Sequence, residues 1–102
     1  MIVEMRTYTL HVGRLQEFVE QYRSSGFALQ CRYLGEPLGW YLADGGALSQ
    51  VVSLWRYLDH EDRASRRERL AADAQWQAYL QRVSPLFQAM ENRFLSPAAL
   101  AA

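Results

Sequence analysis

Hydrophobic and polar residues alternate in two stretches of this chain, residues 2–10 and 50–57. In the first, IVEMRTYTL, Glu4, Arg6 and Tyr8 occupy every second position between apolar residues and threonines. Alternation of this kind places successive side chains on opposite faces of a β-strand. We therefore predict a strand over residues 2–10 with one polar face, which either is exposed to solvent or belongs to a functional site.

The second alternating stretch, QVVSLWRY, is rich in the β-branched and aromatic residues that pack well on a pleated surface. Val52 and Leu54 fall on one face of this predicted strand, and we expect that face to contact the core. The other face carries aromatic residues around a small hydroxyl group, a composition typical of a cavity wall or of a second packed layer. It consists of Val51, Ser53, Trp55 and Tyr57.

Apolar residues recur at helical spacing in the segments between the strands. One such stripe consists of Leu15, Phe18, Val19 and Tyr22. We expect Ser24-Ser25-Gly26 to break this helix before a second helical piece over residues 27–34. Gly35 is placed to cap that piece in the left-handed conformation.

A second helical region follows Asp59. Asp59 and Asp62 form a variant of the N-terminal capping box, and Asp62 precedes Arg66 by four residues, the favourable order for an ion pair on a helix. Asp73 is placed to cap a further helix. The core-facing stripe of that helix consists of Trp76, Tyr79, Leu80 and Val83. Ser84-Pro85 ends it, because the residue before a proline is pushed out of helical geometry.

Two further strands complete the pattern. We expect one over residues 38–43, with Trp40 and Tyr41 on opposite faces, followed by a turn at Asp44-Gly45-Gly46 that leads back into the strand of residues 50–57. The last strand covers residues 86–95.

The resulting order, β-α-β-β-α-β with interrupted helices, predicts an α+β, ferredoxin-like fold with a four-stranded antiparallel sheet and helices on one face. A chain of 102 residues can bury one core, so we expect a single domain over its whole length, with a loose tail at residues 96–102. The face that carries Arg6, Tyr8, Ser53 and Trp55 would lie away from the helices. Because so much aromatic surface is rarely left in water, we predict a homodimer in which a second subunit covers that face.

Composition and charge narrow the classes of function. The formal net charge is zero and the 11 basic residues are all arginines. The five arginines between Arg56 and Arg69 are offset by five acids in the same region, so we interpret it as a solvated helix face and expect no nucleic-acid partner. No apolar run approaches the ~20 residues of a membrane helix. Cys31 is a lone thiol, and together these features favour a cytoplasmic protein without a membrane partner.

Motifs of metal and nucleotide chemistry do not occur in the sequence. His11 and His60 stand at a turn and at a helix start, and their spacing is not that of a zinc site. Serine-hydrolase, P-loop and CxxC patterns are also missing. We therefore expect neither a metal nor a cofactor.

Several motifs, in order along nearly the whole chain, resemble the NIPSNAP family. They are MIVEMRTYTL, YLGEPLGW, QVVSLWRY, DRASRRERLAAD, a tryptophan at 76 and MEN at 90–92. This resemblance implies a dimeric α+β barrel, in which two ferredoxin-like sheets close around a lumen. The superfamily includes cofactor-free monooxygenases, small polyketide cyclases, isomerases and haem-degrading enzymes, but the NIPSNAP branch has no single agreed reaction. Where the family commonly has a histidine this chain has Ser53, so an acid–base role at that position is not carried over.

The candidate ligand-binding residues are Arg6, Tyr8, Tyr41, Ser53 and Trp55. They would line a lumen between the sheets of a dimer or between sheet and helices, where Arg6 could pair with a carboxylate or oxyanion and Trp55 and Tyr41 could stack on a flat ligand. Catalytic residues are not identified. Three hypotheses follow: a metal-free oxygenase, cyclase or isomerase acting on a small aromatic or polyketide-like molecule, a non-catalytic module that binds such a molecule, and a structural dimer.

Overall fold

The computed structural model of the chain describes residues 1–43, 45–46 and 48–101. Four antiparallel strands form one sheet in the order β2-β3-β1-β4. The strands are β1 (Ile2–Leu10), β2 (Gly39–Leu42), β3 (Gln50–Tyr57) and β4 (Phe87–Leu95). The predicted strand order along the chain and the antiparallel sheet are thereby confirmed.

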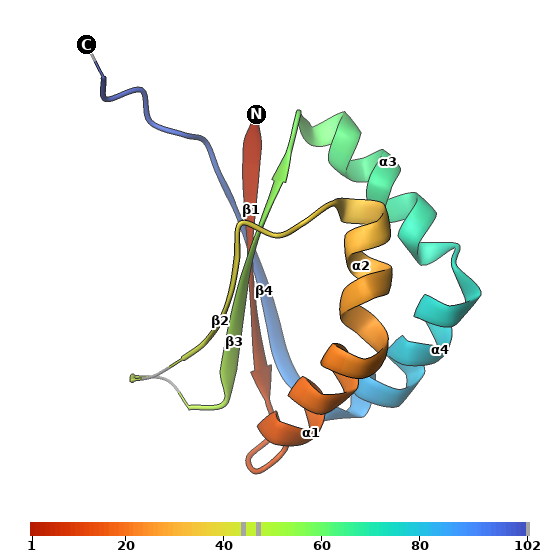
Figure 1. The fold of residues 1–102 in the computed structure, drawn as a ribbon. Helices are drawn as coiled ribbons and strands as arrows, with labels where there is room; N and C mark the ends of the chain where they lie inside the picture. Colours follow the sequence, from red (N-terminus) through yellow and green to blue (C-terminus); the bar gives the residue numbers. More distant parts are fainter. Residues whose placement is uncertain (44, 47, 102) are drawn as a thin grey trace.

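The helices form a single layer against one face of this sheet, and the opposite face has no helix over it among the described residues (Figure 1). They are α1 (Leu15–Gln21), α2 (Phe27–Leu34), α3 (His60–Ala71) and α4 (Ala74–Val83). The buried residues of α1, α2 and α4 include Phe18, Leu29 and Val83, as expected for amphipathic helices that cover a sheet. The α+β, ferredoxin-like architecture predicted from the sequence is confirmed.

The first helix is interrupted where predicted and the second helical piece begins at Phe27 as expected, but the interruption is a π-helical turn over Tyr22–Gly26 rather than a break in the chain of hydrogen bonds. The Phe27 amide donates to the Tyr22 carbonyl, five residues back, so the backbone stays hydrogen-bonded. Gly26 is buried against α4: a Cβ atom there would lie 2.6 Å from Cζ of Tyr79. Glycine therefore allows a close approach of two helices here.

The predicted helix ends are confirmed. Asp59 accepts a hydrogen bond from the Asp62 amide, and the Asp62 carboxylate accepts one from the Leu58 amide. Asp73 accepts from the amides of Gln75 and Trp76 at the start of α4. Gly35 ends α2 as predicted and has a positive φ of 81°, which favours glycine, but its ψ of −177° differs from that of the left-handed helical cap that was expected.

The assignment of the two sheet faces is wrong and must be reversed. Glu4, Arg6 and Tyr8 of β1 lie on the face beneath the helices, and so do Ser53 and Trp55 of β3. Val52 and Leu54 lie on the opposite face and are half-buried. Alternation along a strand separates two faces but carries no label for which one is inside. The polar face can be buried because its charged groups find hydrogen-bond partners on other elements, among them Arg63 of α3 and Asn92 of β4.

The ends of the strands differ slightly from expectation. The β2 strand is confined to Gly39–Leu42, and β4 begins at Phe87 because a 3-10 turn over Ser84–Leu86 precedes it. Asp44 of the predicted turn and Ala102 of the predicted tail lie outside the described residues. Residues 96–101 have no helix or strand and extend away from the sheet (Figure 1). Among the helices described, none is long and apolar enough to cross a membrane.

Candidate functional site

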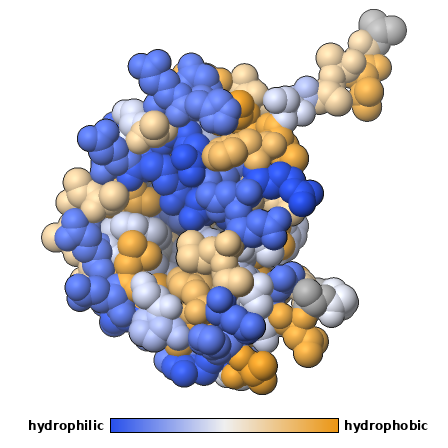
Figure 2. Space-filling model, turned by 180° about the vertical axis from the view of Figure 1, so that it is seen from behind, coloured by the Kyte–Doolittle hydropathy of each residue, from blue (hydrophilic) through white to orange (hydrophobic). Residues whose placement is uncertain are grey.

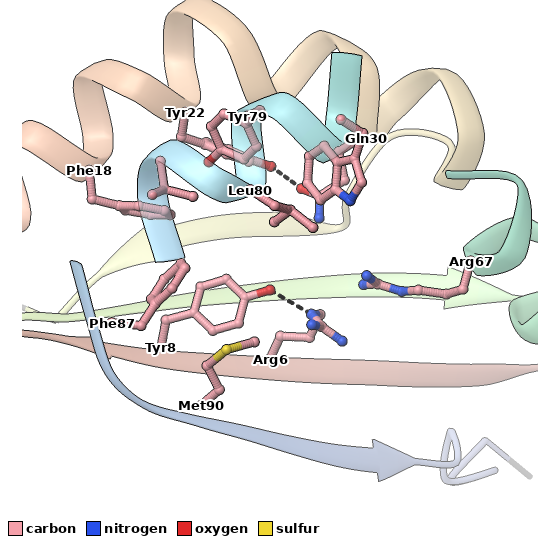
Figure 3. Close-up of a pocket in the computed structure, with 12 residues that line it drawn as sticks. Arg6, Tyr8, Phe18, Tyr22, Gln30, Arg67, Tyr79, Leu80, Phe87 and Met90 are labelled. Atoms are coloured by element: carbon pink, nitrogen blue, oxygen red, sulfur yellow. Dashed lines mark hydrogen bonds between the residues drawn. The ribbon is translucent and has the colours of Figure 1, made fainter. Parts of the chain in front are cut away.

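A cavity of about 150 Å³ lies between the sheet and the helices. Strands β1 and β4 form its floor, α4 and the Tyr22 region form its roof, and α3 reaches in from one end (Figure 3). Its walls consist of Arg6, Tyr8, Phe18, Tyr22, Gln30, Arg67, Trp76, Tyr79, Leu80, Val83, Phe87 and Met90. A cavity of this size can hold a molecule as large as benzene.

One end of the cavity is apolar and aromatic. Phe87 packs edge-on against Tyr8, with ring centroids 5.1 Å apart, and against Phe18, at 5.2 Å. The thioether of Met90 lies beside Tyr8, and Leu80 lies opposite on the roof (Figure 3). This end would favour a flat apolar group, because aromatic edges and faces pack well on another ring.

The other end of the cavity is polar and cationic. The guanidinium groups of Arg6 and Arg67 lie there on opposite sides (Figure 3). Gln30 enters from α2, and its amide oxygen accepts a hydrogen bond from the Tyr22 hydroxyl. Burial raises the pKa of Tyr22, so this phenol stays protonated and serves as a hydrogen-bond donor.

Glu4 organises the cationic end from beneath. Its side chain is fully buried, and its Oε2 atom accepts from Arg6 at 2.9 Å, from Arg63 at 2.8 Å and from Asn92 at 3.0 Å. Nη2 of Arg67 lies 3.5 Å from the Oε1 atom. Residues far apart in the chain thus converge on one carboxylate, which holds the guanidinium groups close together.

The pKa of Glu4 lies below the ordinary value of a glutamate. Burial by itself raises this pKa, but the hydrogen bond from Arg63 and the charges of Arg6 and Arg67 lower it by more. Glu4 is therefore ionised at neutral pH. Burial likewise lowers the pKa of Arg6, but the contacts with Tyr8 and Glu4 outweigh it and raise that pKa, so Arg6 remains charged.

Arg67 keeps hydrogen-bonding capacity at the edge of the cavity. Its Nε and Nη2 atoms are shielded from solvent and have no hydrogen-bond partner within the described part of the chain. Buried polar atoms in proteins nearly always find partners, so atoms left without one commonly mark a place where a ligand or water binds. Nη2 faces Oε1 of Glu4 at 3.5 Å, whereas the Nε–H group has no such partner, so Arg67 can donate a further hydrogen bond to an anion beside it.

Tyr8 joins the two ends of the cavity. Its hydroxyl oxygen accepts a 2.8 Å hydrogen bond from Nε of Arg6, while its ring forms part of the aromatic end. Since the hydroxyl oxygen already accepts this bond, its own proton can be donated to a ligand. Tyr8 is therefore the side chain best placed to deliver a proton to a bound carbonyl or enolate.

The candidate residues chosen from the sequence lie in three different places. Arg6 and Tyr8 line the cavity. Ser53 and Trp55 lie on the same sheet face but form a buried pair of their own, in which the indole Nε1 donates to the Ser53 hydroxyl at 2.9 Å. Tyr41 is 52% exposed on the opposite face, so the expected stacking of Trp55 and Tyr41 on one ligand is wrong.

Arg67 and Gln30 are the polar cavity residues that sequence reasoning missed, although helical spacing could have found both. Arg63, Arg67 and Leu70 recur at i, i+4 and i+7, which places the two arginines on the buried stripe of α3. The interpretation of this helix face as simply solvated is thus wrong for Arg63 and Arg67, whose side chains are only 24% and 20% exposed. Gln30 lies three residues after Phe27 and four before Leu34, again on the core side of its helix.

Within the described residues, histidine, cysteine and acidic side chains do not gather in any group of three or more that could hold a metal ion. Cys31 is half-buried, and burial raises the pKa of its thiol. The chemistry that the cavity offers therefore comes from arginines, a phenol, an amide and aromatic rings.

Solved structures of known families share this fold. The chain is similar to a NIPSNAP family protein from Agrobacterium tumefaciens, with 42% identity, a TM-score of 0.95, and coverage of 98% of this chain and 95% of that chain. An antibiotic biosynthesis monooxygenase has a TM-score of 0.66 at 10% identity, covering 96% of this chain and 99% of that one, and this likeness concerns the fold alone.

Relatives are also found among longer proteins. The NipSnap homolog of Dictyostelium discoideum is 28% identical over 97 residues, which cover 95% of this chain and 43% of that protein. The chain thus spans less than half the length of this relative. The NIPSNAP family model matches residues 3–102, almost the entire chain. By this match and by its structural likeness to NIPSNAP proteins, the chain belongs to the NIPSNAP family.

Proposed function

We propose that this protein binds a small aromatic or polyketide-like molecule in the cavity between sheet and helices, and that it acts on this molecule by metal-free chemistry of the oxygenase, cyclase or isomerase type. The observation that carries the proposal is the division of one cavity into an aromatic end and a cationic end. Binding sites for small molecules commonly combine apolar walls with a few convergent polar groups. The chain contains both features at one place.

The arrangement of Tyr8 and Arg6 favours chemistry at an oxygen atom of the ligand. A carbonyl or enolate oxygen near the cationic end would accept a hydrogen bond from the Tyr8 hydroxyl, and the guanidinium groups would stabilise negative charge that develops there. Isomerases and cyclases that pass through an enolate need this kind of stabilisation.

Binding can be tested with a cavity-filling variant. Leu80→Trp places an indole in the roof of the cavity, whereas Leu100→Trp adds the same group to the exposed C-terminal tail. Titration calorimetry with a panel of one-ring and two-ring aromatic compounds should detect binding to the unchanged protein and to Leu100→Trp, but not to Leu80→Trp. Equal binding to all three proteins would contradict the proposed location.

Turnover separates an enzyme from a binding module. The compounds that bind should be incubated with the protein in air, with oxygen consumption and product formation followed by electrode and chromatography. We expect Tyr8→Phe to retain binding and to lose most of the turnover, because the ring remains while the proton donor is removed. Binding without any turnover would instead favour the non-catalytic module, and no binding would leave the structural dimer.

A further inference from the structure

The side chain of Arg67 enters the cavity from the buried stripe of α3. Its guanidinium group points toward Arg6 across the cationic end (Figure 3). Arg69, on the same helix, is exposed. Arg67 is therefore an arginine of α3 whose side chain lines the cavity instead of extending into bulk solvent.

The other arginines of this cluster donate to Glu4 or Tyr8, although Nε of Arg63, like Nε of Arg67, has no hydrogen-bond partner within the described residues. Arg6 donates from Nε to Tyr8 and from Nη1 to Glu4. Arg63 donates from Nη2 to Glu4 at 2.8 Å and lies over the ring of Phe94, with its Cζ atom 4.9 Å from the ring centroid. Of the acids in the described chain, Glu4 is the one that Arg6, Arg63 and Arg67 all approach, so positive charge exceeds negative charge at this place.

Nε and Nη2 of Arg67 belong to one edge of the guanidinium plane and have no hydrogen-bond partner in the described ranges, although Nη2 lies 3.5 Å from Oε1 of Glu4. Their N–H bonds point in nearly parallel directions, which is the geometry that receives the two oxygens of a carboxylate. A planar carboxylate therefore matches both this incompletely paired edge and the excess positive charge. The adjacent cavity of about 150 Å³ leaves room for a single ring.

We infer that Arg67 anchors a carboxylate group, and that the ligand of this cavity is a one-ring aromatic carboxylic acid whose ring lies between Tyr8, Phe87 and Leu80. This inference rests on the proposed binding function and narrows its substrate class. The charge supplied by the ligand offsets the excess of guanidinium groups around Glu4. The aromatic end then holds the ring.

Benzoate, phenylacetate and the neutral analogue benzamide test this inference. Calorimetry and the fluorescence of Trp76, which lines the cavity, report their binding to the unchanged protein and to Arg67→Gln, Arg67→Lys and Arg69→Gln. Loss of charged hydrogen bonds from Arg67→Gln should weaken carboxylate binding roughly ten- to a hundredfold. Arg67→Lys should weaken it as well, since a lysine keeps the charge but loses the planar fork.

The control Arg69→Gln should bind both carboxylates as the unchanged protein does. Benzamide should bind at least tenfold more weakly than benzoate and should not respond to Arg67→Gln. The melting temperature of Arg67→Gln should fall only slightly, because Arg6, Arg63 and Asn92 still donate to Glu4. A normal melting curve would show that weaker binding does not come from unfolding.

Two outcomes would overturn the inference in different ways. If benzoate and benzamide bind equally well and Arg67→Gln changes neither, the aromatic cavity stands but the carboxylate anchor falls. If no aromatic compound binds, neutral or anionic, the proposed function falls and the inference falls with it.

Discussion

At the scale of single residues, Glu4 decides how a polar strand face can be buried. A glutamate without any exposed surface would be costly unless ionised partners satisfied it. Here Arg6, Arg63 and Asn92 donate to its carboxylate. The same contacts hold the guanidinium groups at the cationic end of the cavity, so one residue links the stability of the fold to the geometry of the site.

Replacing Glu4 should therefore be strongly destabilising. Glu4→Gln leaves the arginines without a counter-charge, and breaking a buried ion pair by removing one partner typically costs about 3–5 kcal/mol. Urea unfolding should show this loss in the free energy of unfolding. Glu61→Gln, at an exposed position of α3, is the matched control and should change it little. Equal stability of the two variants would show that Glu4 is not essential to the cluster.

The lowered pKa of Glu4 also predicts an acid-sensitive contribution to stability. The folded protein binds the proton of this carboxyl less tightly than the unfolded chain does, so the contribution is complete above the ordinary glutamate pKa of ~4.3. It is lost as the pH falls through the lower pKa of Glu4 in the folded protein. Between about pH 4.3 and this lower value, the free energy of unfolding should fall more steeply for the unchanged protein than for Glu4→Gln, and parallel curves would contradict the assignment.

At the scale of secondary-structure elements, the π-helical turn sets the roof of the cavity. It joins α1 to α2 without a break and brings Tyr22 and Gln30 into hydrogen-bonding contact. Gly26 lies in this turn and contacts the ring of Tyr79 on α4. The missing side chain at Gly26 thus allows α4 to approach closely enough to close the cavity from above.

Adding one methyl group at this position should disturb both packing and binding. A Cβ atom at residue 26 would lie 2.6 Å from Cζ of Tyr79 and 2.9 Å from Cδ1 of Tyr22, both on buried rings. Overpacking of this kind usually costs about 1–3 kcal/mol. Gly26→Ala should lower the melting temperature accordingly, whereas Gly45→Ala, where a Cβ atom meets nothing within 4 Å, should not. A stable Gly26→Ala variant would mean that α4 can shift away without loss.

At the scale of the whole molecule, the sheet has helices on one face and an open second face. Val3, Met5, Val52 and Leu54 give this open face an apolar centre, and these side chains are half-buried in the isolated chain. Seen from behind, further hydrophobic side chains lie beside the base of the C-terminal tail, amid a largely hydrophilic surface (Figure 2). Surfaces of this composition are commonly covered by another subunit.

We propose that a second copy of the chain covers the open face, which is opposite to the one first expected from the sequence. Arg56 and Glu91 place both signs of charge beside the apolar centre, as a self-complementary interface requires. Leu54→Arg should convert the dimer into a folded monomer in light scattering, while Arg14→Leu, on the connection before α1, should leave it dimeric. A monomeric unchanged protein at micromolar concentration would contradict this proposal.

Much of the fold and part of the site follow from local rules in the sequence. Alternation defined the strands, the acids at 59 and 73 defined two helix starts, and Gly35 defined a helix end, because each depends on neighbours along the chain. Arg6 and Tyr8 were recognised as site residues since polar groups inside an alternating strand are unusual. The interruption expected at residues 24–26 is a π-helical turn, a form that no local pattern indicated, and Gly26 within it packs against Tyr79 of another helix.

Only the tertiary structure decided which face of the sheet is covered by the helices and which arginine side chains are buried. The alternating pattern alone places Glu4 and Arg6 on one face and Val3 and Met5 on the other, but it does not show which face is covered by the helices. The order depends on contacts across the fold: Arg63 and Arg67 of α3 and Asn92 of β4 approach Glu4, and the two positive charges together with the amide hydrogen bond make its burial favourable. These partners are 59 to 88 residues away from Glu4 along the chain, so no local pattern contains them. The cavity exists because of that convergence.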